Sequence, residues 1–104
     1  MSNLLINIKE LISFYIQINY DEYLKEKKIS FIPENQIKKV ITDMFDTKIN
    51  HMIQFVKNAL KDILKDEYPE ESKIDLLFTE ILNDKDFCIN KLYIEIKIYQ
   101  VKNK

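Results

Sequence analysis

The sequence predicts a mainly helical protein of the α+β class, with three helices followed by a single C-terminal β-strand. Apolar residues recur at helical spacing from residue 4 to residue 83, and two prolines stand where the second and third helices are expected to begin. From Leu92 onward the apolar residues instead alternate one by one, as they do in a strand. An all-α fold is the alternative. The length of 104 residues indicates one domain, residues 1–104.

The first helix is expected over residues 4–27. Ser2 or Asn3 can cap its start, and the lysines of residues 25–28 place positive charge at its end, where the helix dipole favours it. Ile6 and Phe14 lie off the main apolar face, so this helix should contact neighbours on two sides. The residues at i, i+3, i+4 spacing are Leu4, Leu5, Ile8, Leu11, Ile12, Tyr15, Ile16, Asn19 and Tyr23.

The central helix, residues 33–66, is the most clearly specified element. Pro33 suits its first turn, and Tyr68, which precedes Pro69, should lie outside it. Its apolar positions recur after eleven residues, a period of about 3.67 per turn that keeps them in one nearly straight stripe. A helix of this length is roughly 50 Å long, whereas a compact chain is about 34 Å across. The molecule is therefore elongated, or a second copy or partner covers the protruding stripe. We favour the second interpretation because an exposed apolar stripe is costly.

Two shorter segments complete the predicted fold. A β-favouring connector, residues 29–32, precedes the central helix, and a third helix is expected over residues 69–83 with Asn83 as its stop. The predicted strand covers residues 91–101 and needs a partner, which can be the connector, a second copy or another protein. In the strand pattern Leu92, Ile94, Ile96 and Ile98 alternate with Tyr93, Glu95, Lys97 and Tyr99. The helical alternative runs through Ile89, Leu92, Tyr93, Ile96 and Tyr99.

The composition excludes several kinds of binding site. The chain contains no glycine, so it has no glycine-rich phosphate loop, and no arginine, so it lacks the forked donors that grip phosphate or guanine. The formal net charge is −1, and residues 4–20 are too polar for a membrane span. Cys88 is the only cysteine, and no secretory signal is evident, so an intracellular, cytoplasmic location is expected, with nucleus or virion as alternatives. Abundant isoleucine, lysine and asparagine indicate an AT-rich genome, for example that of a large DNA virus.

Few residues suggest chemistry, and each has a simpler structural role. His51 has no carboxylate or histidine three or four residues away, so we expect no metal there. Cys88 follows a phenylalanine and is expected to be a buried, unreactive thiol rather than a catalytic partner of His51. Three further charged sets fit solvated helix faces or helix starts: Asp43 with Asp46, Glu70 with Glu71, and Lys57 with Lys61 and Lys65.

These features together predict a non-enzymatic helical interaction or assembly protein, either a homo-oligomer or a subunit of a larger intracellular complex. No cofactor, metal or small-molecule ligand is expected. Nucleic-acid binding is disfavoured, although the outer face of the predicted strand mixes tyrosines and lysines, because Glu95 lies at its centre and the chain is acidic overall. The expected interface residues are Ile41, Phe45, Ile49, Met52, Val56, Leu60, Ile63, Tyr93, Ile94, Ile96 and Tyr99.

The order helix, short connector, long central helix, loop and shorter helix, over residues 4–83, resembles the histone fold. The resemblance lies in the architecture and includes no specific motif. It implies that two copies pair head to tail across their long helices. Because the chain has no arginine, the resemblance favours a pairing domain of a transcription or nucleic-acid-associated complex over DNA packaging.

Overall fold

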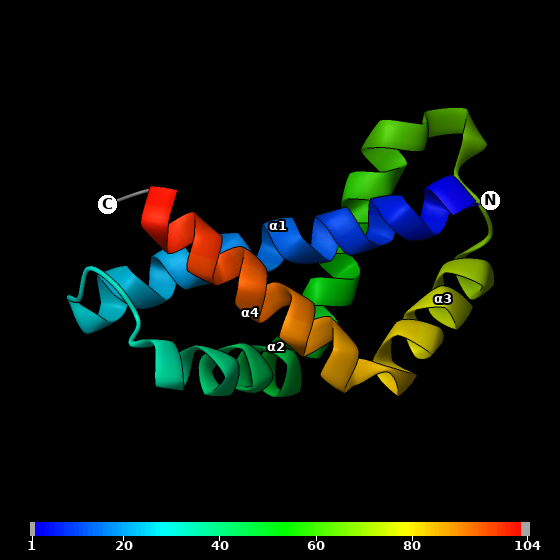
Figure 1. Cartoon of the computed structure of the whole chain (residues 1–104). Coiled ribbons are helices and arrows are strands. Elements are labelled where there is room, and N and C mark those ends of the chain that lie inside the picture. The colour runs from blue at the N-terminus through cyan, green and yellow to red at the C-terminus, as the bar shows by residue number, and fades with distance from the viewer. Residues whose placement is uncertain (1, 103–104) are drawn as a thin grey trace.

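The computed structural model describes residues 2–102, which form four α-helices and no strand. They are α1 (Ser2–Lys27), α2 (Glu34–Leu64), α3 (Glu71–Asn83) and α4 (Lys85–Lys102), with a short 3-10 turn, Lys65–Glu67, after α2. The mainly helical class is therefore confirmed, and the three predicted helices lie within a few residues of their expected bounds. Figure 1 shows α4 crossing in front of α1, while the second half of α2 rises behind α1. Helix α3 lies below the N-terminal end of α1, at the right of the view.

The turn after α1 sets the direction in which the chain enters α2. Lys28 has a φ of 56°, in the left-handed region that glycine adopts most readily. Its N–H bonds to the Lys25 carbonyl and the Ile29 N–H to the Leu24 carbonyl, at 3.2 and 3.1 Å. These two bonds form a Schellman motif, the usual C-terminal cap of a helix. Glycine commonly occupies the left-handed position of this motif, but here the residue is Lys28.

Helix α2 is bent, and this corrects the expectation of a straight rod. Lys48 has non-helical dihedrals, φ −118° and ψ 18°, in the middle of the helix. The Thr47 hydroxyl, one residue before, donates to the Asp43 carbonyl at 2.7 Å, a type of contact that often bends helices. Thr42 makes the same bond to the Lys38 carbonyl without a bend, so this contact alone does not account for the break. The two halves point in different directions (Figure 1). The described residues consequently span only 41 × 26 × 23 Å, so α2 does not protrude as the sequence suggested.

The apolar stripe of α2 is covered by other helices of the same chain. Met52, Val56 and Leu60 in its second half are at most 1 % exposed. The Tyr15 ring of α1 lies against the Phe55 ring, with 5.2 Å between centroids. The α3 helix approaches from another side, where the Lys57 ammonium lies 2.7 Å from an Asp75 carboxylate oxygen. Most of the stripe in the second half of α2 is therefore buried within the chain, although Ile63, near its end, is 58 % exposed.

The C-terminal segment is helix α4, so the predicted strand over residues 91–101 is wrong and the helical alternative is correct. Ile89, Leu92 and Ile96 are buried, as that alternative expected. Ile94 and Ile98 lie on the opposite face and are exposed. The alternation of apolar residues therefore arises from two helical stripes on opposite sides of one helix, which together imitate the period of a strand.

Helix α4 lies parallel to α1 and antiparallel to the first half of α2. The Ser13 hydroxyl donates to Glu95 at 2.5 Å, and the Tyr20 hydroxyl donates to Gln100 further toward the C-terminal ends of both helices. On the other side, the Lys97 ammonium lies 2.8 Å from a carboxylate oxygen of Glu34. These contacts hold α4 in the groove between α1 and α2.

Gln100 also joins α4 to the connector before α2. Its Oε1 accepts the Ile32 N–H at 2.6 Å, and its Nε2 donates to the Ile32 carbonyl at 3.3 Å. Ile32 itself is 2 % exposed. The connector is one of the three strand partners that the sequence suggests for the C-terminal segment. The two segments do lie in contact, but the Gln100 side-chain amide makes the hydrogen bonds that a paired β-strand would have made through its backbone.

The buried side chains form one cluster to which all four helices contribute. It contains Ile8, Ile12, Ile16 and Tyr20 from α1; Ile37, Ile41, Met44, Phe45, Met52, Val56 and Leu60 from α2; Ile74, Phe78 and Ile81 from α3; Ile89, Leu92 and Ile96 from α4; and Ile32 from the connector.

Candidate interaction surface

Helix α4 is apolar on two opposite faces, and only one of them is covered. The core-facing residues Ile89, Leu92 and Ile96 are between 2 and 6 % exposed. The opposite face carries four large apolar side chains, which we call the α4 outer stripe: Phe87, Ile94, Ile98 and Val101, exposed at 63, 56, 51 and 72 %. At about 100° per residue these four lie within a narrow arc of the helix surface.

Single exposed apolar residues are ordinary, but an aligned set is not. Together with Lys91, the α4 outer stripe occupies positions 87, 91, 94, 98 and 101, with intervals of four, three, four and three residues. This is the spacing of the buried seam of a two-helix coiled coil. Contiguous exposed apolar patches larger than a few hundred Å² mark interaction sites. The stripe has the form of a helix surface that packs against another helix.

The polar side chains on the two flanks of the stripe differ in their hydrogen bonds and ion pairs. On the α2 side, Tyr93 and Lys97 both bond to Glu34, at 2.9 and 2.8 Å, and the bond with Lys97 lowers the pKa of the Glu34 carboxyl. On the α1 side, Glu95 accepts from Ser13. Lys91 forms no ion pair within residues 2–102 and so has a free ammonium group beside the stripe.

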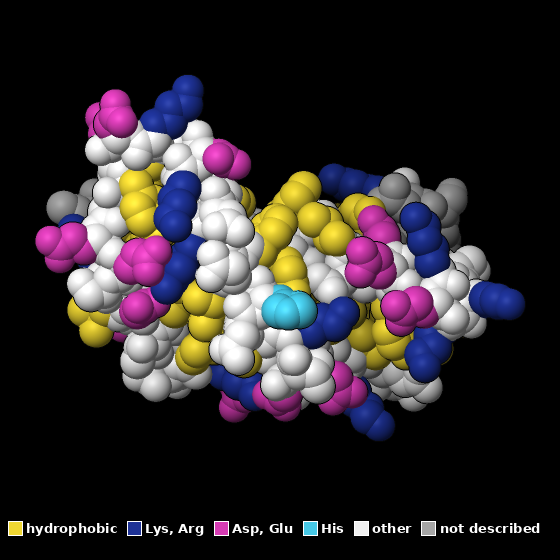
Figure 2. All heavy atoms as spheres, turned by 180° about the vertical axis from the view of Figure 1, so that it is seen from behind, with side chains coloured by type: hydrophobic (Ala, Val, Ile, Leu, Met, Phe, Trp, Pro, Cys, Tyr) yellow, Lys and Arg dark blue, Asp and Glu magenta, His cyan; other side chains and the backbone are white. Residues whose placement is uncertain are grey.

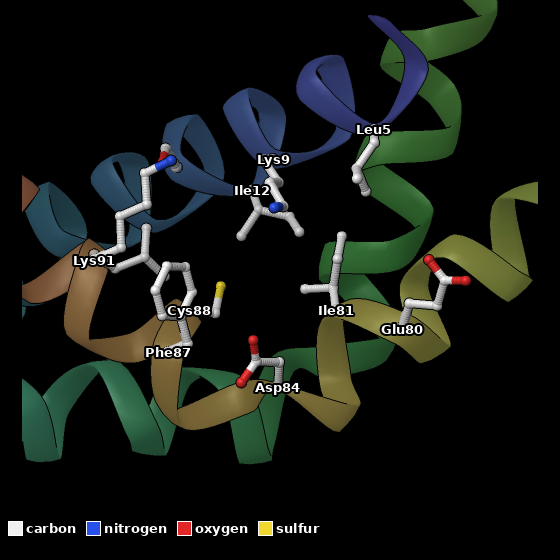
Figure 3. Close-up of a pocket in the computed structure, with 11 residues that line it drawn as sticks. Leu5, Lys9, Ile12, Glu80, Ile81, Asp84, Phe87, Cys88 and Lys91 are labelled. Carbon is white, nitrogen blue, oxygen red and sulfur yellow. The ribbon is translucent and has the colours of Figure 1, made fainter. Parts of the chain in front are cut away.

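A cleft of about 200 Å³ adjoins the N-terminal end of the stripe, between α1, α3 and α4. Figure 3 shows Leu5, Ile12 and Ile81 around it, with the Cys88 thiol and the Asp84 carboxylate directed inward. Phe87 and Lys91 belong to both the cleft and the exposed side of α4, so the two features are continuous. The remaining lining residues are Lys9, Ser13, Glu80 and Leu92.

The cleft lacks the arrangement of a catalytic site. Burial raises the pKa of the Cys88 thiol, and the nearby Lys9 ammonium offsets this only in part, so the reactive thiolate is disfavoured. His51 is not among the residues that line the cleft. It lies on the surface shown in Figure 2, where it is the cyan side chain. Within residues 2–102 no group of three His, Cys, Asp or Glu side chains is placed to hold a metal ion.

The structure buries most of the interface residues expected from the sequence within the chain itself. Ile49, Tyr93 and Tyr99 are partly buried, and only Ile63 and Ile94 are exposed, at 58 and 56 %. The buried ones are Ile41, Phe45, Met52, Val56, Leu60 and Ile96. Of the full set, Ile94 alone belongs to the α4 outer stripe.

Three residues of the stripe were not singled out from the sequence. Phe87, Ile98 and Val101 join Ile94 only when the segment is read as a helix with a second apolar face. The signal was the spacing of four and three residues through Lys91, which the strand interpretation concealed.

Four residues of the charged sets noted in the sequence form ion pairs between elements: Asp46, Lys57, Lys61 and Glu71. Lys57 contacts Glu71 and Asp75, and Lys61 lies 3.5 Å from Glu71, so these lysines join α2 to α3. Asp46 binds Lys85 at 2.5 Å and thereby joins α2 to the start of α4. Acidic and basic side chains are interspersed across the face shown in Figure 2, with no continuous basic track.

The mixed set of lysines and tyrosines expected on one face of a strand is divided among different neighbours. Tyr99 donates to Asp21 of α1, at 3.0 Å to the nearer oxygen, whereas Tyr93 and Lys97 turn toward Glu34 of α2. A platform on which nucleic-acid bases could stack is therefore not formed by these residues.

Comparisons of the chain with protein-family models, curated proteins and solved structures find no match in any of the three. None of the helices between residues 2 and 102 has the length and apolarity that crossing a membrane requires.

Proposed function

We propose that this chain is a non-enzymatic interaction or assembly protein that binds another protein through the outer face of α4. The single observation that carries the proposal is the α4 outer stripe, with Phe87, Ile94, Ile98 and Val101 each at least half exposed on one face of a well-packed helix. Fully burying a side chain of this size contributes about 1.5–3 kcal/mol, so a partner helix gains substantial free energy by covering the stripe.

The rest of the molecule supports a binding role rather than a catalytic one. The core is already closed by the chain's own four helices, so the stripe is not needed for folding. The cleft beside it has a thiol with a raised pKa and no histidine. A reducing intracellular compartment and an AT-rich viral source remain part of the proposal on the strength of the single cysteine and the composition.

Affinity capture from the native source tests the proposal. The wild-type chain should retain a partner, or its own copies, that an Ile94→Glu/Ile98→Glu variant loses, because two carboxylates would have to be desolvated in the contact. Ile63→Glu is the matched control, since Ile63 is equally exposed but lies on α2 outside the stripe. Equal retention by all three proteins contradicts the proposal.

The histone-like alternative, pairing of two long helices, meets an obstacle in the fold. Such pairing needs a free apolar face on α2, but Met52, Val56 and Leu60 are covered by the same chain. Duplex binding that disappears steeply with added salt would favour this alternative, and no binding at low salt would exclude its nucleic-acid part.

A further inference from the structure

We propose that the partner of the α4 outer stripe is a second copy of the same stripe, packed antiparallel about a two-fold axis at Ile94. This inference rests on the proposed function and specifies the partner and its orientation. Three features of α4 carry it: the spacing of its apolar residues, the order of charges along one flank, and the absence of competing ion pairs for the lysines of that flank.

The spacing of the apolar residues in the stripe is symmetric about Ile94, so two antiparallel copies of the stripe can pack against each other. When two copies of α4 are placed antiparallel with Ile94 facing Ile94, Phe87 of one copy lies opposite Val101 of the other, because both are seven residues from the axis. Lys91 then lies beside Ile98, where its methylene stem covers apolar surface while the ammonium reaches the edge of the contact. Every member of the stripe gains an apolar neighbour.

The charges on the α1 side of the stripe alternate in sign. In chain order they are Asp84, Lys91, Glu95 and Lys102, at intervals of seven, four and seven residues. These intervals read the same in both directions, while the signs reverse. In an antiparallel helix pair a flank meets the same flank of the other copy. With the axis at Ile94, Asp84 lies near Lys102 and Lys91 near Glu95, each pair offset by two residues, or about 3 Å along the helix, which a lysine side chain can span. A two-fold contact thus brings four oppositely charged pairs within reach on this flank, against one like-charged pair, the two Glu95 carboxylates beside the axis.

The two lysines of this flank are available for those pairs, whereas Asp84, which directly precedes α4, must turn its carboxylate out of the cleft to take part. Asp84, Lys91 and Lys102 form no ion pair within residues 2–102, and Glu95 accepts one bond, from the Ser13 hydroxyl. Antiparallel packing also places the positive end of each helix dipole beside the negative end of the other. A partner unrelated to this chain has no reason to match a pattern that complements itself, so a second copy is the better explanation.

The size of the contact sets its strength. An 18-residue helix is about 27 Å long, and one pair of such helices buries less than the roughly 800 Å² per partner of a standard stable interface. We therefore expect a reversible dimer with a dissociation constant on the order of micromolar rather than an obligate one.

Sedimentation equilibrium over a range from about 1 to several hundred micromolar tests dimer formation. The wild-type chain and the Ile63→Glu control should shift from monomer to dimer as concentration rises. Ile94→Glu should raise the dissociation constant at least about tenfold, because the two-fold axis brings the two introduced carboxylates together. A wild-type chain that stays monomeric at the highest concentration, or an Ile94→Glu dimer of unchanged affinity, overturns the inference.

Charge reversal tests the flank. Asp84→Lys or Lys102→Asp alone should weaken the dimer by about twofold to fivefold, as expected for exposed ion pairs. The double variant Asp84→Lys/Lys102→Asp should restore the wild-type affinity, because the two signs are exchanged. Additive weakening in the double variant contradicts the assigned pairing.

Cysteine cross-linking tests the orientation. In a Cys88→Ser background, Ile94→Cys should give a disulfide-linked dimer when copper phenanthroline oxidises the two thiols at the axis. Val101→Cys should not, since in the antiparallel arrangement the two introduced thiols are about 20 Å apart along the helix. Cross-linking at both positions indicates a parallel pair and overturns the proposed geometry.

The two proposals can fail separately. If the wild-type chain is monomeric but loses a captured protein on Ile94→Glu/Ile98→Glu substitution, the second copy is rejected and the interaction function stands. If the chain is monomeric and capture is unaffected by those substitutions, both are rejected.

Discussion

Helices α2 and α4 are both rich in apolar residues, but they use them differently. In α2 the apolar side chains form one stripe, and its centre is buried: Met52, Val56 and Leu60 are at most 1 % exposed. In α4 they form two stripes, one in the core and one in solvent, so Ile96 is 2 % exposed while Ile98, two residues later, is 51 % exposed. The helix with the stronger amphipathic pattern is therefore the structural element, and the helix with the weaker pattern carries the free surface.

This difference shows what an amphipathic pattern does and does not indicate. A single strong stripe indicates a helix whose apolar face has one environment, and the core of a small domain provides it. A helix that is apolar on opposite faces has two environments, and in a chain of this size only one of them can be its own core. The second face is therefore the better predictor of a partner.

The largest expected effect separates the two faces of α4. Ile96→Ala should lower the free energy of unfolding by about 2–5 kcal/mol, because it leaves a cavity in the core. Ile98→Ala, on the outer stripe, should change it by less than about 1 kcal/mol. Urea denaturation at submicromolar protein, where the dimer is dissociated, measures both. Similar losses from the two substitutions would show that the outer face is covered within the monomer.

A second expected effect concerns the attachment of α4 to the connector. Gln100→Ala should lower the free energy of unfolding by about 1–3 kcal/mol, because the buried Ile32 N–H and carbonyl lose their partner. Gln54→Ala is the control, since Gln54 bonds only to exposed Asn58 on its own helix. If both substitutions are equally mild in urea denaturation, water replaces the Gln100 amide and the attachment is not stabilising.

Tyr20, whose hydroxyl also bonds to Gln100, predicts a loss of stability at alkaline pH. Burial raises the pKa of Tyr20 to about 12, whereas an unfolded tyrosine titrates near about 10. The folded state therefore favours the neutral phenol, and this stabilisation is complete below pH about 10 and is lost as the pH rises toward 12. Lys57, Lys97 and Tyr99 have raised pKa values and act in the same direction.

The informative quantity is thus the difference between wild type and Tyr20→Phe. Unfolding free energies measured from pH 8 to pH 12 should fall less steeply in the variant, which has no phenol to ionise. Parallel curves would show that Tyr20 does not contribute to the alkaline loss.

The smallest expected effect lies in the turn between α1 and α2. Lys28→Gly should raise the free energy of unfolding by about 1 kcal/mol, because glycine has no Cβ to oppose the positive φ. Lys25→Gly, within α1, should lower it by about 1 kcal/mol. Thermal or urea unfolding distinguishes the two, and destabilisation by both substitutions would contradict the left-handed conformation at residue 28.

Much of the helical fold could be predicted from local sequence. Pro33 and Pro69 locate the starts of α2 and α3 to within two residues, and Asn83 is the last residue of α3. The bend at Lys48 could not be predicted in this way, because Thr42 and Thr79 make the same hydroxyl-to-carbonyl bond as Thr47 without a break in the helix beside them. Without the bend, the length argument predicted a protruding rod.

The candidate surface could be predicted only in part. Ile94 is among the interface residues expected from the sequence, but Phe87, Ile98 and Val101 are not, because two helical stripes together give the period of a strand. Burial of the α2 stripe depends on which helices pack against it, for example α3 through Lys57 and Asp75. The local spacing of apolar residues does not predict such long-range contacts.

The bonds from Gln100 to Ile32 have a consequence for synthesis on the ribosome. The two residues are 68 positions apart, so the Ile32 N–H and carbonyl lack the Gln100 amide until residue 100 has been translated. The α1–α2 hairpin can form early from nearby contacts, but α4 closes the groove between them only after it leaves the exit tunnel. We therefore expect nascent chains that end before residue 100 to be digested by protease, and full-length released chains to resist it.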